Sequence, residues 1–160
     1  MIQKRIWAVV CGQLRQEFEL YQILTLLCCW RNEEIIEEIV ISTWIGEPDR
    51  IQGFREKCSF LGITLIESSM PDDSAGKYQS LNYLRQATQL HEALIRIPED
   101  VWVLKCRTDF CIDLLAKLKR CFSDEMKTEK IGTFEPVFRY KIAVIQFGTS
   151  LPFVLGDLAF

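Results

Sequence analysis

The sequence predicts an α/β domain of three layers, in which a mainly parallel sheet has helices on both faces. Three observations lead to this prediction. Short apolar runs of strand length recur along the chain, segments with apolar residues at helical spacing separate them, and Gly or Pro residues mark most boundaries. Strands that alternate with helices in this way pair in parallel, because each helix returns the chain to the same end of the sheet.

The predicted elements follow one another without a low-complexity linker. The first strand is expected at residues 5–11, an apolar run that ends at Gly12 and is typical of a strand buried on both faces. A helix is expected from residue 14 to about residue 30, where apolar side chains recur every three or four positions. The later elements are strands at 38–44, 63–66, 101–104, 131–134 and 141–147, and helices at 49–60, 78–96 and 112–122.

Length and composition are those of one globular domain. The chain has 160 residues, of which 49% are hydrophobic and 26% charged, and its net charge is -3. We therefore predict a single domain over residues 1–160, without the basic surplus of a nucleic-acid-binding protein. The apolar ending at residues 156–160 favours a domain that is incomplete at its C-terminus. No apolar run reaches the roughly 18 residues that cross a bilayer, so we expect a cytoplasmic protein with at most peripheral membrane contact.

The cysteines favour reduced thiols over disulfides. There are seven, an odd number, scattered mostly through apolar runs in a chain that opens without a signal-peptide pattern. We expect them to be largely buried. Cys106 and Cys111 form no Cys-x-x-Cys motif and have no further partners at zinc-finger spacing, so a zinc site is not predicted and a cysteine-based redox protein is the least favoured class.

Candidate site residues lie where the predicted strands end, because ligands of open α/β sheets bind beyond the carboxyl ends of the strands. Gly12 and Gln13 follow the first strand, where the backbone either approaches a ligand closely or simply turns. Thr43 and Trp44 end the second strand. The indole of Trp44 is suited to stack on a base or a sugar, or to pack under a helix.

Charged residues follow the fourth apolar run. If that strand continues, period-two alternation places Lys105, Arg107 and Asp109 on one face. Burying these charges unpaired would be costly, which leaves two interpretations evenly matched. One is a structural ion-pair cluster at the sheet edge. The other is a site for a diphosphate and a divalent metal, formed by two cations and a carboxylate.

The helix at 78–96 carries a polar stripe, in which Asn82, Arg85, Gln86 and Gln89 recur at helical spacing. A solvated face is the usual explanation of such a stripe, and a face turned toward the strand ends is the alternative. His91 falls on the apolar side of the same helix and is expected to be a packed core residue.

Taken together, these residues resemble a known family. The matching blocks are Ser42-Thr43-Trp44, Asn82-x-x-Arg85-Gln86, Lys105-x-Arg107-Thr-Asp109, and Pro152-Phe153 before Gly156-Asp157. In order and spacing they are similar to the WavE lipopolysaccharide synthesis family, whose members are regarded as GT-A-like glycosyltransferases. The resemblance implies a GT-A-like, Rossmann-like fold. It also implies transfer of a sugar from a nucleotide-sugar donor to a lipopolysaccharide or surface polysaccharide acceptor, at the inner face of the membrane.

The resemblance also implies roles for individual residues. Arg85 and Gln86 are expected to face the strand ends, and Asp109 occupies the metal-facing position of the Asp-x-Asp motif common in that fold, where Mn²⁺ or Mg²⁺ would bind. Arg107 replaces the first acid of the motif, which leaves the metal requirement open, because an arginine can itself neutralise a diphosphate. Asp157 is the candidate general base, although an Asp after Gly also suits a turn. A non-catalytic nucleotide- or sugar-binding or scaffold domain of the same fold is the rival hypothesis.

Overall fold

The computed structural model describes residues 5–71 and 81–109, with the side chains of residues 81–83 left out. These residues belong to one compact unit that includes Met1–Ile112. The predicted domain extends to residue 160, so its full extent remains a prediction. The helix and the two strands expected after residue 110 lie outside the described residues.

Strands and helices alternate along the described chain as predicted. The elements are β1 (Ile6–Cys11), α1 (Glu17–Asn32), β2 (Glu38–Trp44), the 3₁₀ turn η1 (Pro48–Arg50), α2 (Phe54–Phe60), β3 (Thr64–Ser68), α3 (Leu81–Leu94) and β4 (Trp102–Arg107). One expected helix, at 49–60, is divided into η1 and α2, because Gly53 precedes α2 with a φ of +69°. Strand β4 continues through Arg107, beyond the apolar run that predicted it.

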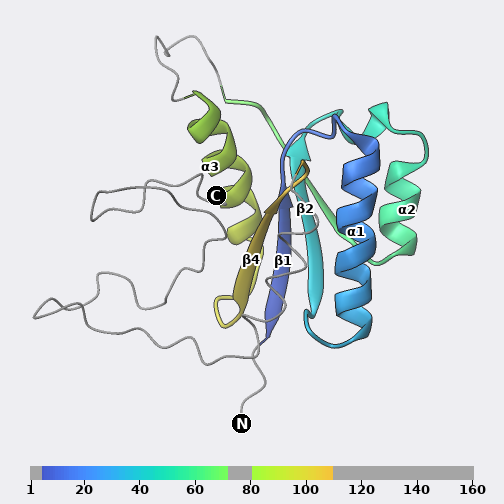
Figure 1. Ribbon diagram of the computed structural model, residues 1–160. Helices are drawn as coiled ribbons and strands as arrows, with labels where there is room; N and C mark the ends of the chain where they lie inside the picture. The colour runs from blue at the N-terminus through green and yellow to red at the C-terminus, as the bar shows by residue number, and fades with distance from the viewer. Residues whose placement is uncertain (1–4, 72–80, 110–160) are drawn as a thin grey trace, which may run out of the picture. The chain divides into compact units, whose positions relative to one another are not determined.

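The four strands form one parallel sheet in the order β3-β2-β1-β4. Helices α1 and α2 cover one face of this sheet, and α3 covers the other (Figure 1). The predicted three-layer α/β architecture with a parallel sheet is therefore confirmed for the described residues, and it is consistent with a Rossmann-like layout. The strand order reverses at β1, whose two neighbours are β2 and β4.

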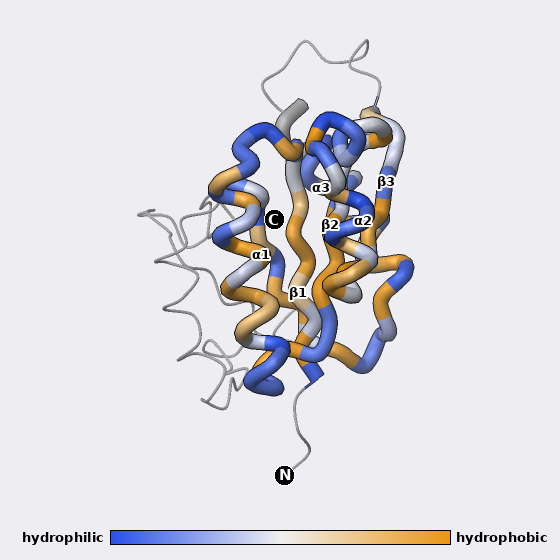
Figure 2. The backbone as a smooth tube through the Cα atoms, turned by 90° about the vertical axis from the view of Figure 1, so that its right-hand side faces the viewer, coloured by the Kyte–Doolittle hydropathy of each residue, from blue (hydrophilic) through white to orange (hydrophobic). Residues whose placement is uncertain are grey.

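Strand β1 lies in the middle of the hydrophobic core. Most of it has hydrophobic colour in Figure 2, whereas α1 shows both hydrophilic and hydrophobic colour along its length. On the α3 side, its residues Val9 and Cys11 join one buried cluster with Val40, Ile66, Ala93 and Ile97. On the other side, Ala8 and Val10 are fully buried. Burial on both faces explains why the sequence shows continuous apolar runs and not alternation.

Helix α3 packs on the sheet with a different face from the one that its sequence predicts. Gln89 and Ala93 are 2% and 0% exposed, whereas Leu84 and Ile95 are 49% and 61% exposed. His91 is exposed too, so its expected place in the core is wrong. The orientation of α3 has a local reason. The hydroxyl of Ser42 on β2 donates a hydrogen bond of 2.7 Å to the main-chain carbonyl of Gln89 and so holds this side of the helix against the sheet. The sheet thus presents a polar group to this helix as well as an apolar surface.

Candidate functional site at the ends of β1 and β4

Strands β1 and β4 end side by side at the point where the strand order reverses. Their parallel register pairs Cys11 with Arg107. The crossover through α1 lies on one face of the sheet, and α3, which leads to β4, lies on the other (Figure 1). In open α/β sheets such a reversal separates the loops after two adjacent strands and is the usual place of ligand binding. We call this region the β1–β4 edge: Gly12, Gln13, Lys105, Arg107, Thr108 and Asp109.

Gly12 allows the two strand ends to approach closely. Its φ is +148°, and a Cβ atom added there would lie 2.4 Å from Oγ1 of Thr108. The Thr108 hydroxyl donates to the main-chain carbonyl of Gln13 at 2.8 Å, and the Thr108 amide donates to the carbonyl of Cys11 at 3.2 Å. Gly12 and the Gln13 carbonyl therefore have a structural role, which is to join the end of β4 to the end of β1. Their predicted part in donor binding is not tested by these contacts.

Lys105 and Arg107 lie on one face of β4, as alternation predicts. Lys105 pairs with Val9 and Arg107 with Cys11, both of which belong to the cluster under α3. Asp109 lies beyond the end of β4, and the guanidinium of Arg107 donates to both of its carboxylate oxygens, at 2.8 and 2.7 Å. These hydrogen bonds lower the pKa of Asp109. The carboxylate that the sequence singled out is thus engaged with an arginine two residues earlier.

Lys105 differs from the other cations of this region in its surroundings. Its side chain is half-buried, and its ammonium lies 3.5 Å from Oε1 of Gln86 on α3, at the limit of a hydrogen bond. Burial, with a smaller contribution from the charge of Arg107, lowers the pKa of Lys105 to about 8. Within residues 5–71 and 81–109 no carboxylate lies within ion-pair distance of this ammonium. The β1–β4 edge therefore contains two cations and one carboxylate.

The polar stripe of α3 contributes to this edge. Gln86 contacts Lys105, and Arg85 is half-buried beside it in the helix. Gln89, one turn later, is buried, and its side-chain nitrogen has no hydrogen-bond acceptor within the described part of the chain. The predicted orientation of Gln86 toward the strand that carries Lys105 agrees with this contact. Gln89 was part of the stripe in the sequence, but its burial was not expected.

Thr43 and Trp44, predicted from the end of β2, are in the core. Their side chains belong to residues that are 0% and 4% exposed. Thr43 pairs with Glu67 and Trp44 with Ser68 in the neighbouring strand β3. This burial agrees with the alternative in which Trp44 packs under a helix, and it leaves little ring surface for stacking on a ligand.

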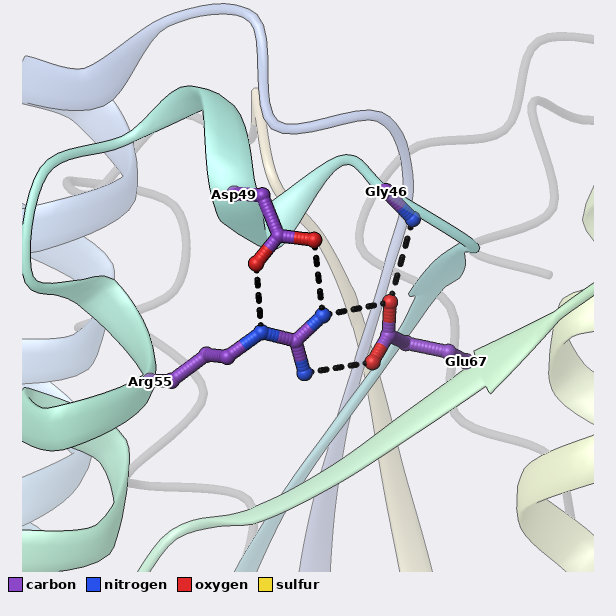
Figure 3. A network of polar contacts seen from close by, with 4 residues as sticks. All are labelled: Gly46, Asp49, Arg55 and Glu67. Carbon is purple, nitrogen blue, oxygen red and sulfur yellow. Dashed lines mark hydrogen bonds and ion pairs between the residues drawn. The ribbon is translucent and has the colours of Figure 1, made fainter.

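A second polar cluster joins the ends of β2 and β3, and sequence reasoning missed it. We call it the β2–β3 edge: Gly46, Asp49, Arg55 and Glu67 (Figure 3). Arg55 donates to Asp49 at 2.6 and 3.0 Å and to Glu67 at 2.6 and 2.9 Å, and the Gly46 amide donates to Glu67 at 3.1 Å. These contacts raise the pKa of Arg55 and lower the pKa values of both carboxyl groups.

Glu47 is a buried carboxylate that connects two loops. It is 5% exposed, accepts a hydrogen bond from the main-chain amide of Leu14 at 3.1 Å, and forms an ion pair with Arg50 at 2.7 Å. The loop after β1 is thereby held to the turn after β2. No signal in the sequence distinguishes Glu47 from an exposed turn residue, since it lies in a Gly-Glu-Pro-Asp segment of the kind that is normally solvated.

The described cysteines are free thiols. Cys11, Cys58 and Cys106 are buried, Cys28 is half-buried and Cys29 is exposed, so the expected burial is only partly observed. Burial raises the pKa of Cys11 and Cys106 to about 12 and that of Cys58 to about 11. Thiols with such pKa values are poor nucleophiles at neutral pH, which disfavours redox chemistry at Cys106. Cys111 lies outside the described residues.

The described residues do not by themselves form a ligand set that suits Mn²⁺ or Mg²⁺. Such ions prefer several oxygen ligands, and both oxygens of Asp109 already accept hydrogen bonds from Arg107. Residues 5–71 and 81–109 also contain no group of three or more His, Cys, Asp or Glu residues arranged to hold a metal. Asp157, the candidate base, lies outside the described residues together with its sequence block.

No protein-family model matches the chain, and neither the curated proteins nor the solved structures searched include a similar one. The resemblance to the WavE family therefore stays a prediction that depends on the four sequence blocks. Among the helices of the described residues, none is both long enough and apolar enough to cross a membrane.

Proposed function

We propose that this protein is a glycosyltransferase that binds a nucleotide sugar at the β1–β4 edge and transfers the sugar to a lipopolysaccharide or surface polysaccharide acceptor. The acceptor would be a glycan or a lipid-linked glycan. In this proposal the fold is of the GT-A type, and the protein acts in the cytoplasm at the inner face of the membrane, with peripheral contact at most.

The observation that carries the proposal is the charge of the β1–β4 edge. Lys105 and Arg107 share one face at the reversal of strand order, and one carboxylate accompanies them. A nucleotide sugar brings a diphosphate, whose negative charge complements this surplus, and a departing nucleoside diphosphate gains still more charge. Cations aimed at developing charge are a general means of lowering the barrier to such a step. Gln86, in contact with Lys105, supplies a polar neighbour for the same ligand.

The resemblance assigns the general base to Asp157 and a divalent ion to Asp109. Asp157 would take the proton of the attacking acceptor hydroxyl. Of the two assignments, only that of Asp109 can be compared with described geometry, and Asp109 is held by Arg107. The proposal of sugar transfer does not depend on the metal, because arginine and lysine can neutralise the leaving diphosphate.

A binding domain without turnover is the second candidate. The observation that favours it is the engagement of Asp109, because a carboxylate with both oxygens on a guanidinium is not free for the divalent ion that the resemblance assigns to it in catalysis. Such a domain would bind the same nucleotide or sugar through Lys105 and Arg107 and release it unchanged.

Thermal unfolding with a panel of nucleotide sugars, followed by assays of donor hydrolysis and transfer, tests both candidates. The proposed enzyme should be stabilised by several degrees by at least one donor, because a ligand specific for the folded state raises its apparent stability. It should also release nucleoside diphosphate. Stabilisation without any release would support the binding domain, and no stabilisation by any donor would contradict both.

A further inference from the structure

The carboxylate of Asp109 is surrounded by positive charge. Arg107 binds both of its oxygens, and the charge of Lys105 also lowers its pKa. A divalent cation placed on Asp109 would compete with the guanidinium for its oxygens and would be repelled by both cations. The arrangement is the one expected of a carboxylate that orients an arginine, because a bidentate pair fixes the plane of the guanidinium.

Burying the charge of Lys105 costs free energy that contacts with the described residues do not offset. Its ammonium is partly removed from water, and a weak contact with Gln86 replaces the lost hydration. Partly buried charges are normally paired, since an uncompensated one is unfavourable. Residues that lower stability in this way are often kept for binding or catalysis. An anionic group would provide the missing partner.

Gln89 gives an independent indication on the same helix. It is 2% exposed, lies three residues after Gln86, and its side-chain nitrogen donates to no acceptor within the described part of the chain. A buried donor of this kind normally finds an oxygen atom from protein, water or a ligand. Among residues 5–71 and 81–109, the cation of Lys105 thus has no carboxylate partner and the amide donor of Gln89 has no acceptor.

We propose that this chain binds the phosphate groups of its ligand directly through Lys105 and Arg107, without a divalent cation, and that Asp109 is a positioning residue for Arg107. The inference rests on the proposed function for the identity of the ligand as a nucleoside diphosphate derivative. It departs from the metal-binding role that the family resemblance implies for Asp109.

Calorimetric titration of the purified chain with inorganic pyrophosphate, UDP and GDP, in EDTA and again with Mn²⁺, tests the inference. At least one probe should bind in EDTA, with a dissociation constant within about threefold of its value in Mn²⁺. Lys105→Gln should weaken that binding at least tenfold, as expected when a charge-assisted contact is lost. Lys105→Arg should restore most of it, and Arg96→Gln, which removes a cation paired with Glu92, is the matched control and should leave it unchanged.

Asp109→Asn distinguishes a positioning residue from a metal ligand. The inference expects a loss of a few fold that is the same in EDTA and in Mn²⁺. Binding that requires Mn²⁺ and disappears in Asp109→Asn would overturn it. Thermal unfolding shows whether each variant folds. If a variant does not fold, the comparison of probe binding in EDTA and in Mn²⁺ by the unsubstituted protein still tests the inference.

The failure of this inference can be distinguished from the failure of the proposed function. Donor turnover that requires Mn²⁺ would leave the glycosyltransferase proposal intact and overturn direct phosphate binding. Phosphate binding in EDTA without turnover of any nucleotide sugar would support the inference and contradict the enzyme. If no probe binds under either condition, direct phosphate binding is wrong, and the panel of nucleotide sugars decides on the proposed function.

Discussion

The two polar edges of the sheet both combine carboxylates with cations, but in opposite proportions. At the β2–β3 edge two carboxylates share one guanidinium, and the donors of Arg55 are directed at Asp49 and Glu67 (Figure 3). At the β1–β4 edge the described residues supply one carboxylate, that of Asp109, which pairs with Arg107, and Gln86 is the described side chain that lies at hydrogen-bond distance from the ammonium of Lys105. At the β2–β3 edge the charge of Arg55 is compensated by two carboxylates. Lys105 forms no ion pair with a carboxylate of residues 5–71 or 81–109, and it lies where an α/β sheet usually binds its ligand.

This difference indicates which cluster is structural. A network with satisfied hydrogen bonds holds loops in place, and the β2–β3 edge connects the turn after β2 to α2 and β3 in this way. An edge with an incompletely compensated cation contributes less to stability than its residues could provide. Substitutions at the two edges should therefore have different effects on folding and on anion binding.

The largest effect on stability is expected from Gly12→Ala. The new Cβ would lie 2.4 Å from Oγ1 of Thr108 at a φ of +148°, so backbone strain and a steric clash add together. We expect a loss of about 3 kcal/mol or more in the free energy of unfolding, measured by urea denaturation. Gly46→Ala is the control, because its φ is +81° and nothing lies within 4 Å. It should cost about 1 kcal/mol. Equal losses would show that Thr108 can move aside.

Lys105→Met should separate stability from binding. Methionine has a similar length and no charge to desolvate, so the free energy of unfolding at pH 7 should rise by about 1 kcal/mol. In the same protein pyrophosphate affinity should fall at least tenfold. Chemical denaturation and calorimetry on one preparation measure both quantities. A variant that is clearly less stable would mean that the ammonium has a structural partner.

Anion binding should weaken as the pH rises. The pKa of Lys105 is lowered from 10.5 to about 8, so its charge is present below pH 8 and is lost above it. Pyrophosphate affinity should fall about fivefold between pH 7 and pH 9.5, although a bound anion shifts the pKa upward. The stability of the free protein should rise over the window from about 8 to 10.5, where the unfolded chain binds more protons.

The groups around Lys105 make this pH dependence specific. They come from β1 and from β4 and its end: Cys11, Cys106, Arg107 and Asp109. The two thiols have pKa values of about 12 and stay neutral over this range. A guanidinium such as that of Arg107 stays charged throughout. The pKa of Asp109 is lowered, so it stays ionised. A profile that is unchanged in Lys105→Met would contradict the assignment.

The smallest effect is expected from Arg55→Met at the β2–β3 edge. Its side chain is 44% exposed, so the loss in the free energy of unfolding should be small, even though two carboxylates lose their partner. The loss should shrink as the pH falls through 4, because Asp49 and Glu67 have lowered pKa values in the folded protein and the pair stabilises it only while they are ionised. Pyrophosphate affinity should change less than twofold, and a larger change would connect this edge to the ligand.

The sequence predicted those features that depend on local pattern. Continuous apolar runs predicted the strands, and alternation beyond Leu104 predicted that Lys105 and Arg107 share a face. The pairing of β4 with β1 was not predictable, because it depends on contacts such as that between Thr108 and Gln13, 95 positions apart. The network around Arg55 was missed for the same reason, since its members come from three separate elements.

The polar stripe of α3 was predicted correctly, but its surroundings were not. Polarity alone does not distinguish a face in water from a face against polar groups of a sheet. Gln89 is buried, and the apolar residue Leu84 is exposed, because the carboxyl end of the sheet offers Ser42 and Lys105 to the helix. The error about His91 follows from the same assumption.

The parallel pairing of β1 with β4 also has a consequence for the order of folding. In the sheet, β1 lies between β2 and β4. Strand β1 is synthesised first, but its neighbour β4 is the last of the described elements to leave the ribosome. Until then one side of β1 has unpaired backbone groups, and closing so long a loop is slow compared with forming the earlier pairs. Lys105 and Arg107 arrive with β4, so the capacity to bind an anion should appear only in chains in which β4 has paired with β1.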